Sequence, residues 1–338
     1  MAKKIRHSRE SGSPSFLSHQ IGIHWIPAFL GMTFLIATLH AAPAFAQNYP
    51  SKLIRIVTAS PGSTNDWGAR LIAQEMTKSM GQQVIVENRG GLAVEYTAKS
   101  PPDGHTLMFY GNTVWLLPFL RDNVGYDPLR DLAPVTLAII SPIIVVVHPS
   151  VPVRSIKELI ALAKAKPGQL NYAAGTIGAS PHLATELFKA MTHTDMVRIP
   201  YKGTGPSVVA LVAGEAHLMF TALGSVAMHM KTGRLRAIAV ATAKRSELAP
   251  DLPTVAATVP GYEALSIIGM FAPAKTPPAI INLLQQEIAR GINKPEVKEL
   301  FMNAGVEVVA STADEFTAVI KSEMARLGKV IKDAGIRE

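Results

Sequence analysis

Short β-rich runs alternate with longer amphipathic segments along most of this chain, and this order constrains the fold more than any other feature of the sequence. The run Leu53–Val57 ends in a Ser-Pro-Gly turn, and residues 66–80 then carry apolar side chains at helical spacing until Gly81. The same order of strand, turn and helix recurs down the chain. It predicts an α/β fold in which mostly parallel sheets are flanked by helices.

The alternation continues to the C-terminus. Further strands are expected at residues 84–87, 106–110, 143–147, 170–173, 197–199, 218–220 and 237–240. Further helices are expected at residues 155–165, 181–191, 206–213, 277–292 and 313–334. At 338 residues the chain is long enough for two α/β lobes. We expect lobe 1 to comprise residues 47–141 and 270–338 and lobe 2 residues 142–269, with hinge segments near Pro142 and Ile268.

The N-terminal segment has the three parts of a secretory signal peptide. Basic residues lie between positions 3 and 9, an apolar run covers residues 26–39, and Ala44-Phe45-Ala46 supplies the small residues of a cleavage site. The apolar run is shorter than the roughly 20 residues of a membrane-spanning helix. We expect cleavage of residues 1–46 after Ala46 and a periplasmic mature protein; an uncleaved membrane anchor is the alternative.

Composition excludes several classes of function. Cysteine is absent, so disulfides, thiol chemistry and a lipid anchor on cysteine are excluded. The formal net charge is +8, but the basic residues are scattered and lack the runs and aromatic interleaving of a nucleic-acid surface. A modest positive balance suits an anionic solute. We therefore expect no nucleic-acid partner.

Signatures of catalysis and metal binding are poor. The nucleophile-elbow, Walker and dinucleotide-binding patterns are missing from the sequence. His193-Thr194-Asp195 and His229, between two methionines, have no ligand partners at metal-binding spacing. We predict no catalytic residues, no metal and no cofactor.

Three loops follow expected strands and precede expected helices, where open α/β sheets bind ligands. The first covers residues 60–66, the second residues 173–182 and the third residues 200–206. Small and hydroxyl-bearing residues there let backbone N–H groups and hydroxyls reach an anion at a helix N-terminus. Each loop alone could also be an ordinary helix cap. The candidate ligand-binding residues are Gly62, Ser63, Thr64, Asn65, Asp66, Asn112, Gly175, Thr176, Ile177, Gly178, Ala179, Ser180 and Tyr201.

Motifs spread in order over the mature chain resemble the Bug (Bordetella uptake gene) family. They include Tyr49–Lys52, Val86–Arg89, Pro102–Leu107, Asn171–Ala173, Pro200–Gly203, Pro253–Val255, Pro260–Glu263, Ala272–Pro277 and Lys332–Ile336. The resemblance implies a two-lobed periplasmic-binding-protein-like (type II) fold with a ligand cleft between the lobes. It also implies a monomeric, non-enzymatic receptor that delivers a small carboxylate to the membrane subunits of a tripartite tricarboxylate-type transporter. In the family the carboxylate is gripped by the loops that match residues 61–66 and 175–180 here.

The sequence departs from the family pattern at several positions. The Gly-rich segment after Arg89 is shorter, and Ser63 and Asn65 stand where Gly and Thr are usual. Thr221 stands where Asp is common, and Ile267-Ile268 replaces a pattern that often carries Trp. These changes concern the choice of ligand rather than the fold.

Two other functions are compatible with the sequence. A receptor whose lobes close around its ligand could instead present its surface to a periplasmic sensor domain of a two-component system. An exported hydrolase or lyase could instead use His182 with Asp66 or Ser180.

Overall fold

The structure is a computed structural model that describes residues 49–175, 177–333 and 335–337. The expected signal peptide, its cleavage point after Ala46 and the candidate Thr176 lie outside these residues. The strands are β1 (Ile54–Thr58), β2 (Val84–Asn88), β3 (Thr106–Gly111), β4 (Leu132–Val147), β5 (Leu170–Ala174), β6 (Met196–Pro200), β7 (Leu218–Ala222), β8 (Arg236–Val240), β9 (Leu265–Pro273) and β10 (Glu307–Val308). No helix in this described part of the chain is long and apolar enough to cross a membrane.

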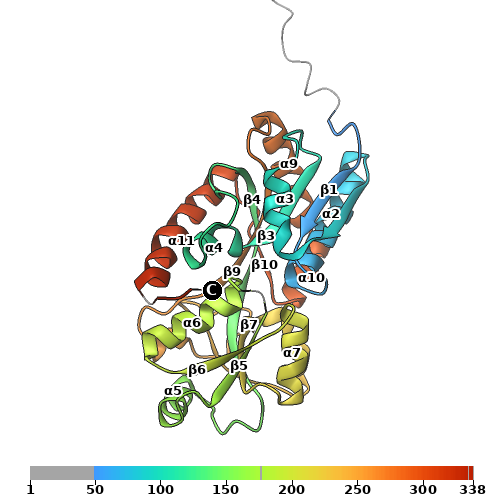
Figure 1. Ribbon diagram of the computed structural model, residues 1–338. Helices are drawn as coiled ribbons and strands as arrows, with labels where there is room; N and C mark the ends of the chain where they lie inside the picture. Colours follow the sequence, from blue (N-terminus) through green and yellow to red (C-terminus); the bar gives the residue numbers. More distant parts are fainter. Residues whose placement is uncertain (1–48, 176, 334, 338) are drawn as a thin grey trace, which may run out of the picture. The chain divides into compact units, whose positions relative to one another are not determined.

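The helices fill the intervals between the strands (Figure 1). The α-helices are α2 (Thr64–Met80), α3 (Ala93–Ala98), α4 (Thr113–Leu120), α5 (Ile156–Ala165), α6 (Ser180–Thr192), α7 (Thr204–Ala213), α8 (Ala227–Lys231), α9 (Pro278–Ile292), α10 (Pro295–Asn303) and α11 (Ala313–Asp333). Short 3₁₀ helices are η2 (Gly90–Leu92), η3 (Leu223–Ser225) and η4 (Val255–Ala257). The predicted alternation of strands and helices is therefore confirmed.

Two groups of strands share the long strand β4. The order is β2-β1-β3-β9-β4-β7-β5-β6, and β8 and β10 also pair with β4. Pairs among β1, β2 and β3, and among β5, β6 and β7, are parallel, whereas β4 and β9 pair antiparallel with all their neighbours. We call the group around β1–β3 the first lobe and the group around β5–β8 the second lobe; Figure 1 shows them above and below β10.

Both faces of the first lobe's strands are covered by helices. On β1, Ile54 and Ile56 pack in one core cluster with α2, α9 and α10, whereas Val57 packs in another with α3, α4 and α11. The second lobe repeats this pattern: in β4, Ile143 and the alternate residues after it face α5 and α6, and Ile144 faces α7. Side chains alternate between the two faces of a strand. A continuous apolar run is therefore needed where both faces are buried.

Two features of β4 and β9 differ from the sequence-based expectation. The strand predicted from Ile143 begins at Leu132 and passes through Pro142 without ending. The partner of β4 changes at this residue, from Leu265 of β9 opposite Pro142 to Ala222 of β7 opposite Ile143. Proline is tolerated here because it stands where one ladder ends and the next begins.

Strand β9 was not predicted, and Gly269 in its middle explains why. A Cβ at this position would lie 2.3 Å from the ring of Phe316 and 2.7 Å from the carbonyl oxygen of Thr136. Only glycine allows α11 and β4 to approach so closely. In a sequence, an isolated glycine weakens the strand pattern that contains it.

Candidate functional site

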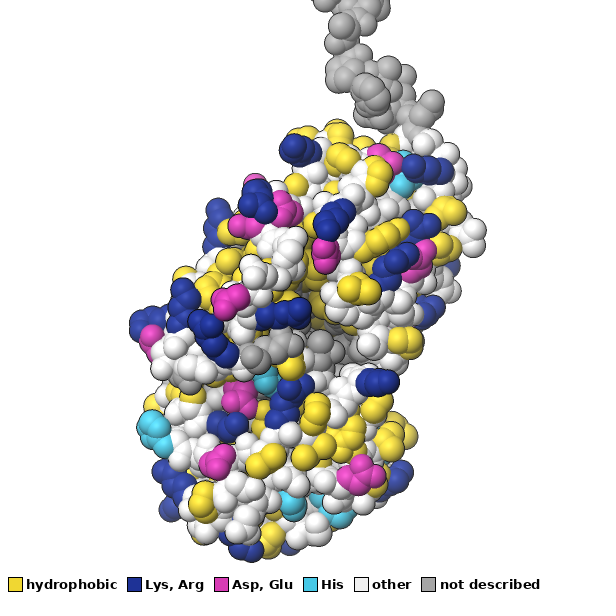
Figure 2. All heavy atoms as spheres, in the orientation of Figure 1, with side chains coloured by type: hydrophobic (Ala, Val, Ile, Leu, Met, Phe, Trp, Pro, Cys, Tyr) yellow, Lys and Arg dark blue, Asp and Glu magenta, His cyan; other side chains and the backbone are white. Residues whose placement is uncertain are grey.

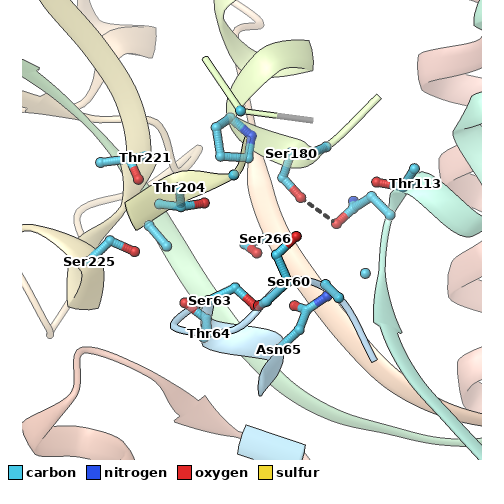
Figure 3. Close-up of a pocket in the computed structure, with 18 of the residues that line it drawn as sticks. Ser60, Ser63, Thr64, Asn65, Thr113, Ser180, Thr204, Thr221, Ser225 and Ser266 are labelled. Atoms are coloured by element: carbon cyan, nitrogen blue, oxygen red, sulfur yellow. Dashed lines mark hydrogen bonds between the residues drawn. The ribbon is translucent and has the colours of Figure 1, made fainter. Parts of the chain in front are cut away.

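The loops at the carboxyl ends of several strands meet around one cavity of about 90 Å³ (Figure 3). Its wall comes from both lobes and consists of Ala59, Ser60, Ser63, Thr64, Asn65, Tyr110, Gly111, Asn112, Thr113, Gly175, Ala179, Ser180, Pro181, Gly203, Thr204, Thr221, Ala222, Ser225 and Ser266. None of these described residues has a charged side chain. The wall is instead rich in hydroxyl groups, several of which surround the same space in Figure 3.

Four helices begin at this cavity. Their first residues are Thr64 of α2, Thr113 of α4, Ser180 of α6 and Thr204 of α7, and all four line it. The first backbone N–H groups of a helix have no partner within the helix, and the helix dipole makes that end positive. Helices from both lobes thus supply an anion-binding environment without a formal positive charge.

The loop after β1 is fixed by its own hydrogen bonds. Ser63 is the N-cap of α2 and accepts a hydrogen bond from the backbone N–H of Asp66 at 3.2 Å. The Asp66 carboxylate accepts hydrogen bonds from the backbone N–H of Gly62 at 3.0 Å and from Asn88 at 2.8 Å, and it pairs with Arg70 at 2.9 Å. Asp66 therefore stabilises the conformation of the loop through these bonds. Neither Gly62 nor Asp66 lines the cavity.

The electrostatics of Asp66 agree with this bracing role. Partial burial by itself raises the pKa of a carboxyl group. Hydrogen bonds from Asn88, Gly62 and Arg70 outweigh that effect and lower the pKa of Asp66 below its ordinary value. The group stays ionised and committed to the loop, so it is not free to act on a ligand.

Asn112 joins the two lobes at the edge of the cavity. Its Oδ1 atom accepts hydrogen bonds from the Ser180 hydroxyl and from the backbone N–H of Ile267, both at 2.9 Å. Beside it, the Thr113 hydroxyl donates to the carbonyl oxygen of Gly178 at 3.0 Å. Asn112 is the N-cap and Thr113 the first residue of α4 in the first lobe, whereas Gly178 precedes and Ser180 begins α6 in the second. The structure thus shows the lobes in contact across the cavity.

Thr221 is the polar residue whose environment most clearly points to a ligand. It lies in β7, is fully buried and lines the cavity. Its Oγ1 atom has no hydrogen-bond partner. A buried hydroxyl without a partner costs free energy. Thr221 therefore has an unused hydrogen bond that it can donate into the cavity.

The structure brings together seven of the thirteen candidate residues. Ser63, Thr64, Asn65, Asn112, Gly175, Ala179 and Ser180 line the cavity. Ile177 and Tyr201 line a neighbouring cavity instead. Gly178 contributes its carbonyl group to the contact with Thr113.

Several lining residues were not among the candidates. Ser60 and Thr204 lie in the first and third loops, which the strand-end rule had identified without selecting them. Thr221 lies near the end of β7, and Ser225 lies in η3 directly after that strand. The sequence showed no candidate ligand-binding loop at this point. Ser266 lies in β9, so it could not be found before that strand was known.

His182 is held in a structural role. Its Nδ1 atom accepts a hydrogen bond from the backbone N–H of Gly178 at 3.3 Å, and the side chain is buried. Burial, aided by the nearby Arg198 charge, lowers the pKa of His182 to about 4. In the described part of the chain its ring is hydrogen-bonded to neither Asp66 nor Ser180. The geometry thus lacks the His182 pairings that the hydrolase hypothesis requires.

These features define a class: a two-lobed α/β solute-binding protein whose cleft lies at the carboxyl ends of its strands. Known proteins of this class match closely. The Rpa4515 protein of R. palustris, solved with adipate, is 34% identical with a TM-score of 0.81, and the match covers 86% of this chain and 99% of that one. MatC of Rhodopseudomonas palustris, solved with malate, is 26% identical with a TM-score of 0.79, covering 84% and 100%.

Sequence comparison gives the family. The profile described as "Tripartite tricarboxylate transporter family receptor" matches residues 68–336. Protein BugT of Bordetella pertussis is 35% identical over 305 residues, which cover 88% of this chain and 94% of BugT. The chain belongs to the tripartite tricarboxylate transporter receptor family, and the resemblance to Bug proteins is confirmed.

Proposed function

We propose that this protein is a periplasmic receptor that captures a small carboxylate by closure of its two lobes. The observation that carries this proposal is the uncharged cavity with four helix N-termini and hydroxyl groups from both lobes. Hydrogen bonds to an ionised acceptor are stronger than those between neutral groups. A carboxylate would gain such bonds from both lobes only when they are together, so its binding favours the closed form.

The strand pairing supports a hinge between the lobes. Pro142 is the last residue of β4 paired with β9, and its partner Leu265 is the first residue of β9. Ile268 pairs with Gly111 of β3 and Ile139 of β4, inside the first lobe. We therefore propose that the second lobe comprises residues 143–264, with crossovers at Pro142 and at Leu265 rather than near Ile268. Of the described residues, 49–142, 265–333 and 335–337 then form the first lobe.

The ligand class rests on chemistry and on the relatives. Adipate and malate, present in the structures of Rpa4515 and MatC, are both small carboxylates. The chain belongs to a family of transporter receptors, which supports delivery of the solute to the membrane subunits of a tripartite tricarboxylate-type transporter. We infer a monomeric, non-catalytic protein exported through a signal peptide cleaved after Ala46.

Binding can be tested with purified protein and a panel of mono-, di- and tricarboxylates. Thermal shift and calorimetry should show at least one acid that raises the melting temperature. Thr204→Val, at the start of α7, should weaken binding of that acid. Thr232→Val is the matched control, because Thr232 is exposed and its hydroxyl bonds to the carbonyl group of Met228 away from the cavity. The proposal fails if every acid leaves both signals unchanged.

A further inference from the structure

Helix α11 belongs to the first lobe but also contacts the second. Phe316 and Ile320, in its first half, are buried in the first-lobe cluster that contains Val57. Leu327 and Val330, in its second half, pack against the second-lobe cluster around α5 and α6. Figure 1 shows the end of α11 close to α6, and Figure 2 shows charged side chains of both signs over this helix, at the edge of the hollow between the lobes. The helix therefore reaches across the boundary at which the lobes meet.

Glu323, in the middle of α11, contacts the cavity residue Asn112 from outside the cavity. Its Oε2 atom accepts a hydrogen bond from Nδ2 of Asn112 at 3.4 Å, and its side chain is 13% exposed. An ionised carboxylate can only accept hydrogen bonds. It therefore holds the amide of Asn112 with Nδ2 toward α11, which leaves Oδ1 to accept the hydrogen bond from Ser180 of the second lobe at 2.9 Å.

The other oxygen of Glu323 leads to the second lobe by a different route. Its Oε1 atom accepts a hydrogen bond from Nη2 of Arg326 at 2.7 Å. Nη1 of Arg326 donates to the carbonyl oxygen of Glu263 at 3.4 Å and lies 3.9 Å from the Glu263 carboxylate. Glu263 is in the second lobe, just before the crossover at Leu265. One carboxylate is thus connected to the second lobe at two places, Ser180 beside the cavity and Glu263 near the hinge.

These contacts can stabilise the closed form without touching the ligand. The hydrogen bond between Asn112 and Ser180 exists only while the lobes are together, and Glu323 orients its acceptor. When only a fraction of the free protein is in the form that binds, the apparent affinity for every ligand is reduced by that fraction. A contact that changes this fraction therefore changes the affinity for all ligands by the same factor, whatever their chemistry.

We propose that Glu323 and Arg326 form a latch that sets how readily the two lobes close around a ligand. This inference rests on the proposed function, because it requires capture by lobe closure. Glu323 is a positioning residue that acts through Asn112 on Ser180, and Arg326 extends the same connection to Glu263. The latch sets the strength of binding and leaves the choice of ligand to the residues that line the cavity.

The test is calorimetry on the full mature chain with two acids that bind the wild type, taken from adipate, malate, succinate and citrate. Glu323→Gln keeps the size of the side chain but removes the charge on which both of its contacts depend. It should weaken binding of both acids by the same factor of about five. Arg326→Gln should weaken both by about twofold to fivefold, because this side chain is partly exposed. Adding Glu263→Gln to Arg326→Gln should cause no further loss, since the two residues form one contact.

Glu287→Gln is the matched control. Glu287 pairs with Arg290 three residues further along α9, as Glu323 pairs with Arg326, and its side chain is 15% exposed. In the part of the chain that the structure describes, neither residue of this control pair has a hydrogen bond or ion pair to the second lobe. Glu287→Gln should therefore leave both affinities unchanged.

The contrary outcomes separate the latch from the proposed function. Equal affinities of the Glu323→Gln and Glu287→Gln proteins would overturn the latch. Different loss factors for the two acids would overturn it as well, because Glu323 would then act on the ligand itself. If Glu323→Gln does not fold, the comparison of Arg326→Gln with Arg290→Gln decides in the same way. Absence of binding of every acid to the wild type would instead refute the proposed function.

Discussion

Replacing Thr221 by valine should change stability and ligand binding in opposite directions. Thr221 is fully buried and its hydroxyl has no partner, whereas valine has nearly the same shape and no polar group. An unsatisfied buried polar group costs about 1–3 kcal/mol. Thr221→Val should therefore raise the free energy of unfolding of the ligand-free protein by about 1 kcal/mol, or the melting temperature by about 2 °C.

Binding should suffer from the same substitution. A hydrogen bond to a charged group contributes about 1.5–3 kcal/mol, so its loss should weaken carboxylate binding by about ten- to a hundredfold. Urea denaturation without ligand and calorimetry with it measure the two effects separately. Thr221→Ser keeps the hydroxyl and should bind nearly as well as the wild type.

Thr136 offers a matched contrast for the stability measurement. It is also fully buried, but its hydroxyl donates to the carbonyl oxygen of Ser311 at 2.7 Å. Thr136→Val removes that hydrogen bond, while the Ser311 carbonyl keeps the one it accepts from Gln285 at 3.0 Å, so the substitution should destabilise the protein by about 1 kcal/mol. If Thr221→Val destabilises the protein as much as Thr136→Val, or leaves the affinity unchanged, the reasoning about its free hydroxyl is wrong.

Three further substitutions test the contacts around the cleft. Gly224→Ala would place a Cβ atom 1.9 Å from the carbonyl oxygen of Ala304. The variant should therefore resist closure of the lobes and bind ligand weakly. Small-angle X-ray scattering should show a more extended particle than the wild type. Asn112→Leu leaves two donors without their acceptor and should lower the free energy of unfolding by about 2–3 kcal/mol in urea. The lowered pKa of His182 means that the unfolded chain binds more protons between about pH 6.5 and pH 4, so stability should fall as pH falls through this window. His182→Asn, which keeps an acceptor near the position of Nδ1, should flatten that part of the pH profile.

The sequence was most informative where local and global patterns agree. The strand at Ile54–Thr58 is rich in β-branched residues and is followed by the Ser60-Pro61-Gly62 turn, and the strand at Thr106–Gly111 is a mostly apolar run; both lie between covered faces. The run containing Pro142 was misjudged because its pattern suggests a break. What permits it is a change of pairing partner, which only the three-dimensional arrangement reveals. Strand β9 was missed for a similar reason. Its Gly269 weakens the strand pattern in the sequence, but the close approach of Phe316 requires a glycine there.

The site was predictable in its principle and less so in its residues. The strand-end rule selected the loops that contain Ser63, Gly175 and Ser180, all of which line the cavity. It could not tell which residues of a loop face inward, so it included Asp66, which turns away to brace its own loop. Nor could it find Ser266, whose place depends on pairing of β9 with strands distant in the sequence.

The chain enters and leaves the second lobe at neighbouring residues, so this lobe can in principle be removed or exchanged as a unit. Pro142 and Leu265 are register partners on antiparallel strands, so the two cut ends lie side by side. Antiparallel neighbours can be joined by a two-residue turn. Residues 143–264 are therefore a cassette inserted into a hairpin, and a short Asn-Gly link could replace it without reordering the remaining strands. The first lobe would keep the core cluster that contains Ile54 and Ile56, and would lose only Leu183 of α6 from the cluster that contains Val57, so it could accept a different inserted segment at the same position.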